Sequence, residues 1–482
     1  LGDVYKRQIL GWIMEIEAAF LALPGIVSAI YGEKGGFAFL WVALGSAVAG
    51  SAIILRKPKN MRFYLREGFV TVALSWILMS VIGCLPFVIN GDIPHFADAL
   101  FEMISGFTTT GATVVSDVEG LTKGSLFWRS FSHWIGGMGV LVFLLAIVPM
   151  AGGSHMNLMK AESPGPSVGK LVPKVRQTAK YLYIIYFALT MIEVIFLLFG
   201  GMNLFEALTT SFGTAGTGGF AIWNDGFVSV SPYNQWVVTI FMLLFGVNFG
   251  FYFLILTGKL RDALKFEEVR IYFIIVIAAA VFIFINLRHF ALYAPAEGIR
   301  QAFFQVASII TTTGFASADF NLWPETSRTI LVLLMFIGAC AGSTGGGIKV
   351  SRFIIACKSF IKEIISYLHP RSVKKIKIEG KPLEHETLRA TNVYFMTYMV
   401  IFAVSVLLVS IENKDLVTNF AAVAATFNNI GPGLSLVGPM ANFGHFTDFT
   451  KYILMFDMLA GRLEIFPMML LFCPAVWKRR RA

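Results

Sequence analysis

Apolar and polar stretches alternate along this chain on the length scale of a lipid bilayer. A membrane-spanning helix needs about 20 consecutive, mostly apolar residues. Windows of that kind lie at 9–30, 37–55, 69–90, 126–149, 180–200, 235–257, 271–288, 328–340 continuing toward 357, 392–411 and 451–476. The pattern predicts an all-α polytopic membrane protein with about ten transmembrane helices.

Four further apolar runs are too short to cross a bilayer. They cover residues 96–107, 203–212, 298–310 and 416–427. Each run stops at small polar residues and a glycine, and a further spanning window follows. We therefore predict that these runs are re-entrant pore helices, which enter the membrane and turn back.

The breaks that end the short runs share a composition rich in threonine, asparagine and glycine. They read TTTGA at 108–112, GTAGTGGF at 213–220, TTTGF at 311–315 and NNIGPG at 428–433. One such cluster is typical of an ordinary turn. Non-helical backbone at membrane depth survives only inside protein or beside a watery cavity, because unpaired peptide groups in lipid cost several kcal/mol. Four copies therefore predict one pore lined by backbone carbonyls.

The break glycines mark a fourfold internal repeat. Gly111, Gly219, Gly314 and Gly431 recur at similar intervals, and each interval holds two spans, a basic loop and a short helix. Such units are parallel copies around an axis along the membrane normal. We expect pore repeats at 68–150, 151–257, 258–365 and 366–482, after an extra helix pair at 9–67. Residues 1–8 match nothing downstream, and we set them aside as a non-native segment.

Composition and charge place and orient the chain in a membrane. Hydrophobic residues make up 56% and charged residues only 14%, whereas soluble domains carry about 25% charge. The net charge of +10 gathers in alternate loops, at 56–66, 160–180, 259–270, 358–389 and 478–481. The positive-inside rule puts these loops and both termini in the cytoplasm. We interpret them as orientation signals rather than nucleic-acid sites.

A glycine-rich stretch interrupts the second span of the third repeat. It comprises Gly342, Ser343, Thr344, Gly345, Gly346 and Gly347, and Lys349 follows. It should unwind, because each glycine costs about 1 kcal/mol in a helix. It lacks the residue order and preceding strand of a nucleotide-binding loop. Arg462 lies in the last span, where a charge is expensive and usually functional. It either pairs with Glu464 or Asp457, or faces the pore and holds the loop.

These motifs resemble the TrkH-type potassium transporters of the Trk/Ktr/HKT superfamily, from about Ile9 onward. The resemblance rests on 108–113 (TTTGAT), 133–139 (HWIGGMG), 338–349 (GACAGSTGGGIK), 428–433 and 461–466 (GRLEIF). It implies four repeats of two spans and a pore helix, after two extra helices. The implied selectivity filter consists of Thr109, Thr110, Gly111, Gly218, Gly219, Thr312, Thr313, Gly314, Asn429, Ile430 and Gly431. The second segment could be centred on Gly216 or Gly219, and the match of 220–221 to 315–316 favours Gly219.

The resemblance also implies a function. The chain would be the potassium-translocating subunit of a Trk-type system in the bacterial plasma (inner) membrane, with K⁺ as the transported ion and no organic cofactor. It would work as a homodimer, surrounded by membrane lipid, with no nucleic-acid partner. A cytoplasmic TrkA-like nucleotide-binding subunit would dock on the basic loops 151–180 and 358–389. Loop 342–347 would block the pore, with Arg462 beneath the filter.

Two other functions stay open at this point. The first is a sodium-permeable or sodium-coupled transporter of the same fold. Gly111 favours potassium, because relatives with serine there tend to pass sodium. The second is a polytopic membrane enzyme, which needs acid, histidine or cysteine groups clustered at one depth. The histidines are scattered, and the four cysteines lack zinc, redox or disulfide spacing, so we expect no enzyme.

Overall fold

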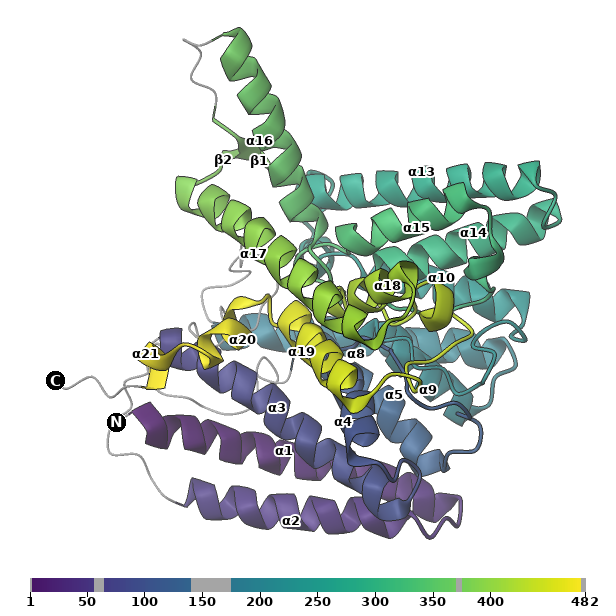
Figure 1. Cartoon of the computed structure of the whole chain (residues 1–482), viewed down its shortest axis with the longest axis vertical. Helices are drawn as coiled ribbons and strands as arrows, with labels where there is room; N and C mark the ends of the chain where they lie inside the picture. The colour runs from purple at the N-terminus through teal and green to yellow at the C-terminus, as the bar shows by residue number, and fades with distance from the viewer. Residues whose placement is uncertain (1, 56–64, 140–174, 370–374, 478–482) are drawn as a thin grey trace.

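The computed structural model describes residues 2–55, 65–139, 175–369 and 375–477, which fold into a bundle of helices (Figure 1). Within these ranges, six helices are long and apolar enough to cross a membrane, or seven if one bent pair counts as a span. The six are α1 (Gly2–Ile30), α2 (Gly36–Ile54), α3 (Leu65–Asn90), α8 (Val175–Phe199), α13 (Glu267–His289) and α17 (His385–Val409). They coincide with the predicted extra pair and the first span of each repeat. Helix α1 also includes residues 2–8, which the sequence analysis had set aside.

Four short helices occupy the predicted re-entrant positions. They are α4 (Phe96–Phe107), α9 (Leu204–Gly216), α14 (Pro295–Ile310) and α18 (Leu416–Phe427). Each packs against the long helix that precedes it, and each is buried along most of its length. Two begin with a polar cap, since Asn203 accepts from the Glu206 N–H and Asp415 from the Thr418 N–H. The caps satisfy backbone donors that the helix leaves unpaired.

The second helix of each repeat differs from the continuous spans that we predicted. These helices are α5 (Lys123–Met138), α10 (Pro232–Phe245) with α11 (Phe249–Leu256), α15 (Glu325–Ile337) with α16 (Val350–Leu368), and α19 (Asp448–Arg462) with α20 (Phe466–Leu471). The bend between α10 and α11 is 89°. The predicted spans 235–257 and 451–476 are therefore wrong as straight helices, and only 328–357 was expected to break. Of the span 126–149, residues 140–149 lie outside the described ranges.

The breaks have a backbone cause. Helix α5 ends before Gly139 and α15 before Gly338, both with positive φ (80° and 74°). Helix α19 ends before Glu464 and Ile465, which also have positive φ (57° and 70°). A residue with positive φ cannot continue a right-handed helix. Helices α5, α15 and α19 thus end at defined residues. The break after α10 is different, because Gly246 has a negative φ (−74°) and the chain turns at Asn248 (φ −57°, ψ 122°) before α11.

The remaining elements are small. They are α12 (Leu260–Ala263), α21 (Pro474–Trp477), the 3₁₀ helices η1 (Phe320–Leu322), η2 (Ser410–Glu412) and η3 (Ser435–Val437), and strands β1 (Lys377–Ile378) and β2 (Lys381–Pro382). The two strands form an antiparallel hairpin with Lys377 opposite Pro382. Helix α16 projects away from the bundle toward this hairpin (Figure 1). The sequence analysis did not predict the hairpin.

Hydrogen bonds between neighbouring repeats close them into a ring. At least one bond joins each consecutive pair, and at least one joins the fourth repeat to the first. The donors and acceptors are Val118 N–H to Asn224 Oδ1 (2.7 Å), Phe227 N–H to the Ala316 carbonyl (2.8 Å), Ser435 N–H to Asn321 Oδ1 (3.0 Å) and Phe443 N–H to the Thr113 carbonyl (2.8 Å). The segments that follow the four pore helices therefore surround a common centre.

Candidate functional site

Each pore helix is followed by a short segment with the same backbone conformation. A residue with positive φ is followed, two positions later, by a glycine with positive φ. The pairs are Thr109 and Gly111 (54° and 77°), Thr217 and Gly219 (53° and 81°), Thr312 and Gly314 (60° and 83°), and Asn429 and Gly431 (55° and 97°). Gly219 thus occupies the position equivalent to the other three glycines. Gly216 is instead the last residue of α9.

The four glycines contact one another's segments in cyclic order. A Cβ atom on Gly111 would lie 1.9 Å from the Gly218 carbonyl oxygen, which belongs to the next repeat. The same distance separates a Cβ on Gly219 from the Thr313 oxygen and a Cβ on Gly314 from the Ile430 oxygen, and a Cβ on Gly431 would lie 2.7 Å from the Thr110 oxygen. Glycine is required because any side chain would overlap the neighbouring carbonyl. The carbonyl groups of Thr110, Gly218, Thr313 and Ile430 therefore stand in one closed ring.

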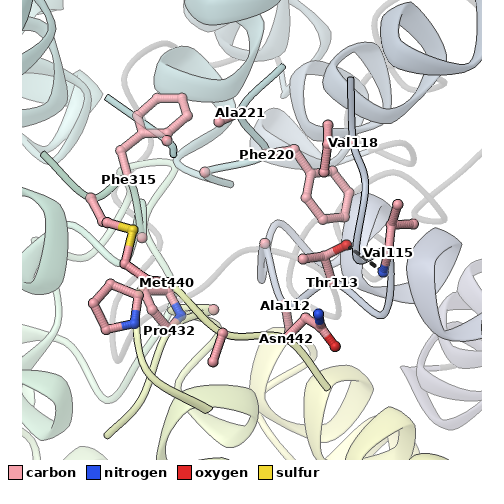
Figure 2. Close-up of a pocket in the computed structure, with 18 of the residues that line it drawn as sticks. Ala112, Thr113, Val115, Val118, Phe220, Ala221, Phe315, Pro432, Met440 and Asn442 are labelled. Atoms are coloured by element: carbon pink, nitrogen blue, oxygen red, sulfur yellow. Dashed lines mark hydrogen bonds between the residues drawn. The ribbon is translucent and has the colours of Figure 1, made fainter. Parts of the chain in front are cut away.

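The four glycines that pack against this ring all line one cavity of about 130 Å³. Figure 2 shows segments from the four repeats around an open centre. The residue after each glycine is phenylalanine in the second and third repeats (Phe220 and Phe315) but Ala112 in the first and Pro432 in the fourth. The cavity is therefore only quasi-symmetric, although its backbone repeats closely.

Buried threonine and asparagine side chains hold the ring from behind. The Thr108 and Thr110 hydroxyls share a hydrogen bond of 2.8 Å, and Thr311 and Thr313 share the equivalent bond of 2.7 Å. In the fourth repeat Asn429 Nδ2 donates to Thr110 Oγ1 (3.0 Å). These contacts pair several of the surrounding side chains with one another, whereas Thr109 Oγ1 and Asn429 Oδ1 are buried with no hydrogen-bond partner among the described residues.

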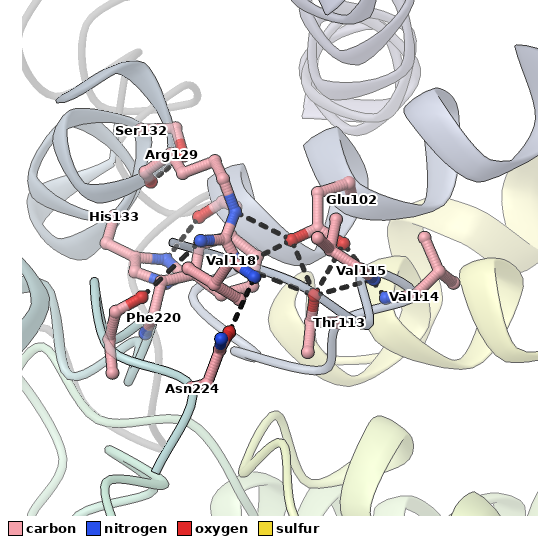
Figure 3. A network of polar contacts seen from close by, with 12 residues as sticks. Glu102, Thr113, Val114, Val115, Val118, Arg129, Ser132, His133, Phe220 and Asn224 are labelled. Carbon is pink, nitrogen blue, oxygen red and sulfur yellow. Dashed lines mark hydrogen bonds and ion pairs between the residues drawn. The ribbon is translucent and has the colours of Figure 1, made fainter. Parts of the chain in front are cut away.

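A buried ion pair supports the first two segments, and the sequence analysis missed it (Figure 3). Glu102 of α4 accepts from Arg129 of α5 at 2.7 Å, and the two side chains are 0% and 2% exposed. Glu102 also accepts from the Thr113 hydroxyl (2.9 Å), and the Arg129 guanidinium lies 4.2 Å from the centre of the Phe220 ring. Removing one partner of such a pair leaves an uncompensated buried charge. The pair therefore fixes the exit of the first segment against the second.

His133 of α5 joins the same two repeats. Its Nε2 accepts from the Phe220 N–H at 3.2 Å, so Nδ1 carries the proton and donates to the Gly106 carbonyl at 2.8 Å. The sequence analysis used this histidine only as part of a motif. The neutral ring ties the end of pore helix α4 to the second segment.

The glycine-rich loop between α15 and α16 lies directly beneath the ring. Gly346 N–H donates to Thr312 Oγ1 at 2.6 Å, and a Cβ on Gly346 would lie 2.9 Å from the Asn428 carbonyl oxygen. The other side of the loop binds the break after α10, where Cys340 N–H donates to the Gly246 carbonyl at 3.1 Å. The loop therefore contacts three of the four repeats from below.

The predicted loop residues from Ser343 to Gly347 and Lys349 are buried, whereas Gly342 is exposed. The Gly342 carbonyl accepts from Phe249 N–H (3.0 Å), the Ser343 hydroxyl donates to Cys340 (2.6 Å), the Thr344 hydroxyl donates to Phe245 (3.2 Å), Gly347 has φ of 71°, and Lys349 Nζ donates to the Gly345 carbonyl. A lysine whose ammonium binds the loop's own backbone stiffens the loop.

Arg462, the last residue of α19, connects this loop to the first repeat. Its Nη1 donates to the Thr344 carbonyl at 2.8 Å, and its Nη2 donates to the carbonyls of Gly136 (2.5 Å) and Gly137 (2.8 Å) at the end of α5. A guanidinium is favoured at the carboxyl end of a helix. Of its two proposed partners, Glu464 forms an ion pair with Arg352, and Asp457 accepts from the Ser405 hydroxyl at 2.7 Å. The geometry thus places Arg462 against the loop.

Comparisons with known proteins agree with this architecture. Residues 37–479 match the family model TrkH, described as a cation transport protein. The chain is 37% identical to the Trk system potassium uptake protein TrkH of Escherichia coli K12, with 98% of both chains covered. It is 35% identical to the protein of that name from Vibrio parahaemolyticus, again over 98% of both.

The structure is also similar to the crystal structure of the potassium transporter TrkH from Vibrio parahaemolyticus. The TM-score is 0.89 at 32% sequence identity, and the match covers 99% of this chain and 100% of that one. Bacterial relatives and the apolar helices together identify a multi-pass membrane protein. By the family model, the relatives and the fold, this chain belongs to the TrkH family of cation transport proteins.

Proposed function

We propose that this chain takes up potassium across a bacterial plasma membrane, as the ion-translocating subunit of a Trk-type system. The observation that carries the proposal is the closed ring of four main-chain carbonyls, each packed against a glycine of the next repeat. Carbonyl oxygens arranged in this way can replace the hydration shell of a cation. Relatives along nearly the whole chain are named potassium uptake proteins.

The proposed filter comprises the ring and the residues around it. It consists of Thr109, Thr110 and Gly111, then Gly218 and Gly219, then Thr312, Thr313 and Gly314, and finally Asn429, Ile430 and Gly431. The pore helices end at these segments, so the negative ends of their dipoles favour a cation there. Flow would follow the electrochemical gradient, in which the membrane potential supplies about 2.3 kcal/mol per charge for each 100 mV.

Loop 342–347, together with Lys349 and Arg462, is the proposed gate. Residues 343–347 are buried, and Gly346 contacts the third and fourth filter segments, where the loop would obstruct an ion leaving the filter. The Arg462 guanidinium binds the loop backbone at the Thr344 carbonyl. Its positive charge would also repel a cation in this water-poor region. Transport then requires the loop to leave its present position.

We further propose an assembly for the protein. Both termini would be cytoplasmic, because the basic loops follow the positive-inside rule. The chain would form a homodimer and bind a TrkA-like nucleotide-binding subunit through loops 151–180 and 358–389. Residues 151–174 and 370–374 of these loops lie outside the described ranges. Nucleotide control would belong to that partner and not to this chain.

Rubidium uptake into liposomes tests the proposed function. The purified full chain is reconstituted, and uptake is driven by an inward-negative potential, with and without excess external sodium. We expect protein-dependent uptake that sodium scarcely inhibits, together with restored growth of a potassium-uptake-deficient bacterium at low potassium. Empty liposomes are the control. Uptake that sodium suppresses as strongly as potassium does would instead support the sodium-permeable alternative.

A further inference from the structure

A single carboxylate joins the two ends of the loop beneath the ring. Glu268, the second residue of α13, is 7% exposed. Its Oε1 accepts from the Ala341 N–H at 2.7 Å and from the Ser351 N–H at 2.9 Å. Ala341 precedes the glycine-rich stretch, and Ser351 lies in the first turn of α16. Helix α13 therefore holds both ends of the loop through one side chain.

The sequence gives α16 no cap of its own, and Glu268 replaces it. The cap position is Lys349, which makes no capping hydrogen bond. The first N–H groups of a helix need an acceptor and favour a negative charge. A carboxylate from a neighbouring helix supplies both. Charge-assisted bonds of this kind are roughly twice as strong as neutral ones, so the clamp contributes directly to holding the loop in place.

A second contact links this clamp to the cytoplasmic hairpin. Glu267, next to Glu268, pairs with Lys358 of α16 at 2.6 Å. The same Lys358 Nζ donates to the Lys377 carbonyl of β1 at 2.7 Å. The first turn of α13 thus grips α16 at two points, one at the loop and one beside the hairpin. A displacement of the hairpin or of α16 would therefore strain both contacts, the Glu268–Ser351 hydrogen bond and the Glu267–Lys358 ion pair.

We propose that Glu268 is a positioning residue that clamps the base of the gating loop, and that movement of α16 relative to α13 releases it. Ser351 moves with α16, whereas Glu268 is fixed in α13, so their hydrogen bond breaks first. Glu268 Oε1 then keeps only one of its two hydrogen bonds, the one from the Ala341 N–H, and the two ends of the loop are no longer joined. This inference rests on the proposed gate, because a clamp matters for transport only if the loop obstructs the pore.

Two buried native cysteines allow the clamp to be tested apart from transport. Cys340 lies in the loop and Cys84 in α3, and both are 0% exposed. We would treat the full chain in liposomes with a small membrane-permeant maleimide and quantify labelling of each cysteine by peptide mass spectrometry. The variants are Glu268→Ala, Glu268→Gln and Glu363→Ala. Glu363 is exposed on α16 and is the matched control.

In Glu268→Ala we expect Cys340 labelling to rise about tenfold, because two charge-assisted hydrogen bonds are lost. Rubidium uptake should rise with it, and Cys84 should stay protected. Glu268→Gln should fall between wild type and Glu268→Ala, because its amide oxygen still accepts from both N–H groups but without the charge that strengthens these bonds. Glu363→Ala should match wild type in both measurements.

Several outcomes would overturn the proposal. These are unchanged or lower Cys340 labelling in Glu268→Ala, equal labelling in the Gln and Ala variants, or a parallel rise at Cys84, which would indicate general loosening. Higher Cys340 labelling without higher uptake would support the clamp but contradict the gate. Absence of rubidium uptake by the wild type would contradict the proposed function, and the labelling would still decide the clamp.

Discussion

Replacing Gly111 by serine should weaken the preference for potassium over sodium. A Cβ at this position would lie 1.9 Å from the Gly218 carbonyl oxygen, and real Cβ contacts scarcely occur below 3.0 Å. The oxygen must therefore leave its place in the ring. The backbone adds a cost of about 1–2 kcal/mol, because φ is 77° and a side chain disfavours that region. The preference is set by the difference between the free energies with which the filter binds potassium and sodium. If that difference falls by about 1.4 kcal/mol, the preference falls tenfold, and we expect at least a tenfold loss.

Gly91→Ser is the matched control. Gly91 has φ of 85° and lies just before the same pore helix, but a Cβ there would meet nothing within 4 Å. It carries the same backbone cost without the contact. The assay is rubidium uptake into liposomes at graded external sodium. We expect Gly91→Ser to retain the wild-type sodium dependence. If Gly111→Ser, recovered as folded protein in the same amount, also retained it, the ring could not be what distinguishes the ions.

Three further changes test other parts of the site. Arg462→Ala removes the bonds to the loop and to α5, so uptake should rise; lower or unchanged uptake at normal expression would refute its gating role. Deleting two residues from 342–347 should also raise uptake, because the shortened loop cannot reach the ring, and impaired uptake in a folded variant would count against obstruction. Glu102→Gln leaves Arg129 buried without its counter-charge, which should cost about 3–5 kcal/mol of stability and lower the melting temperature in detergent. The double variant with Arg129→Gln should recover part of that loss, and a single variant as stable as wild type would show that the pair is not desolvated.

The pore helices could be predicted from the sequence because each is a short apolar run that ends at a cluster of threonine or asparagine and glycine. Helices α4 and α18 cover the predicted residues, whereas α9 continues to Gly216 instead of ending at 212. The extension has a packing cause. A Cβ on Gly213 would lie 2.8 Å from the Phe315 ring, and a Cβ on Gly216 would lie 2.1 Å from the His133 carbonyl. These glycines allow close packing and do not belong to the filter position, and only the match of 220–221 to 315–316 in the sequence pointed to Gly219 instead of Gly216.

Apart from the glycine-rich interruption in the third repeat, the breaks in the second helices could not be predicted in the same way. Hydropathy averages over a window, so an interruption at a few residues leaves the window apolar. Asn248 is a visible signal in hindsight, because its side chain caps α11 by accepting from the Gly250 N–H at 2.8 Å. Ile465 gives no such signal, since its positive φ is unfavourable for a β-branched residue. Tertiary contacts impose it, among them the ion pair of the preceding Glu464 with Arg352.

The contrast between the ring and the region beneath it explains how such a site can be both selective and controlled. The same glycine-to-carbonyl contact recurs between each pair of neighbouring filter segments. A shift of any one segment would therefore change the positions of the carbonyl oxygens that would bind the ion. An element that opens and closes the pore without disturbing the ring must therefore lie outside the four filter segments. The loop from the third repeat, held by Arg462 from the fourth, is such an element. One bond still couples the two, from Gly346 to Thr312. If the loop is the gate that we propose, its departure would remove that donor and leave the Thr312 hydroxyl free to face an ion at the inner end of the filter.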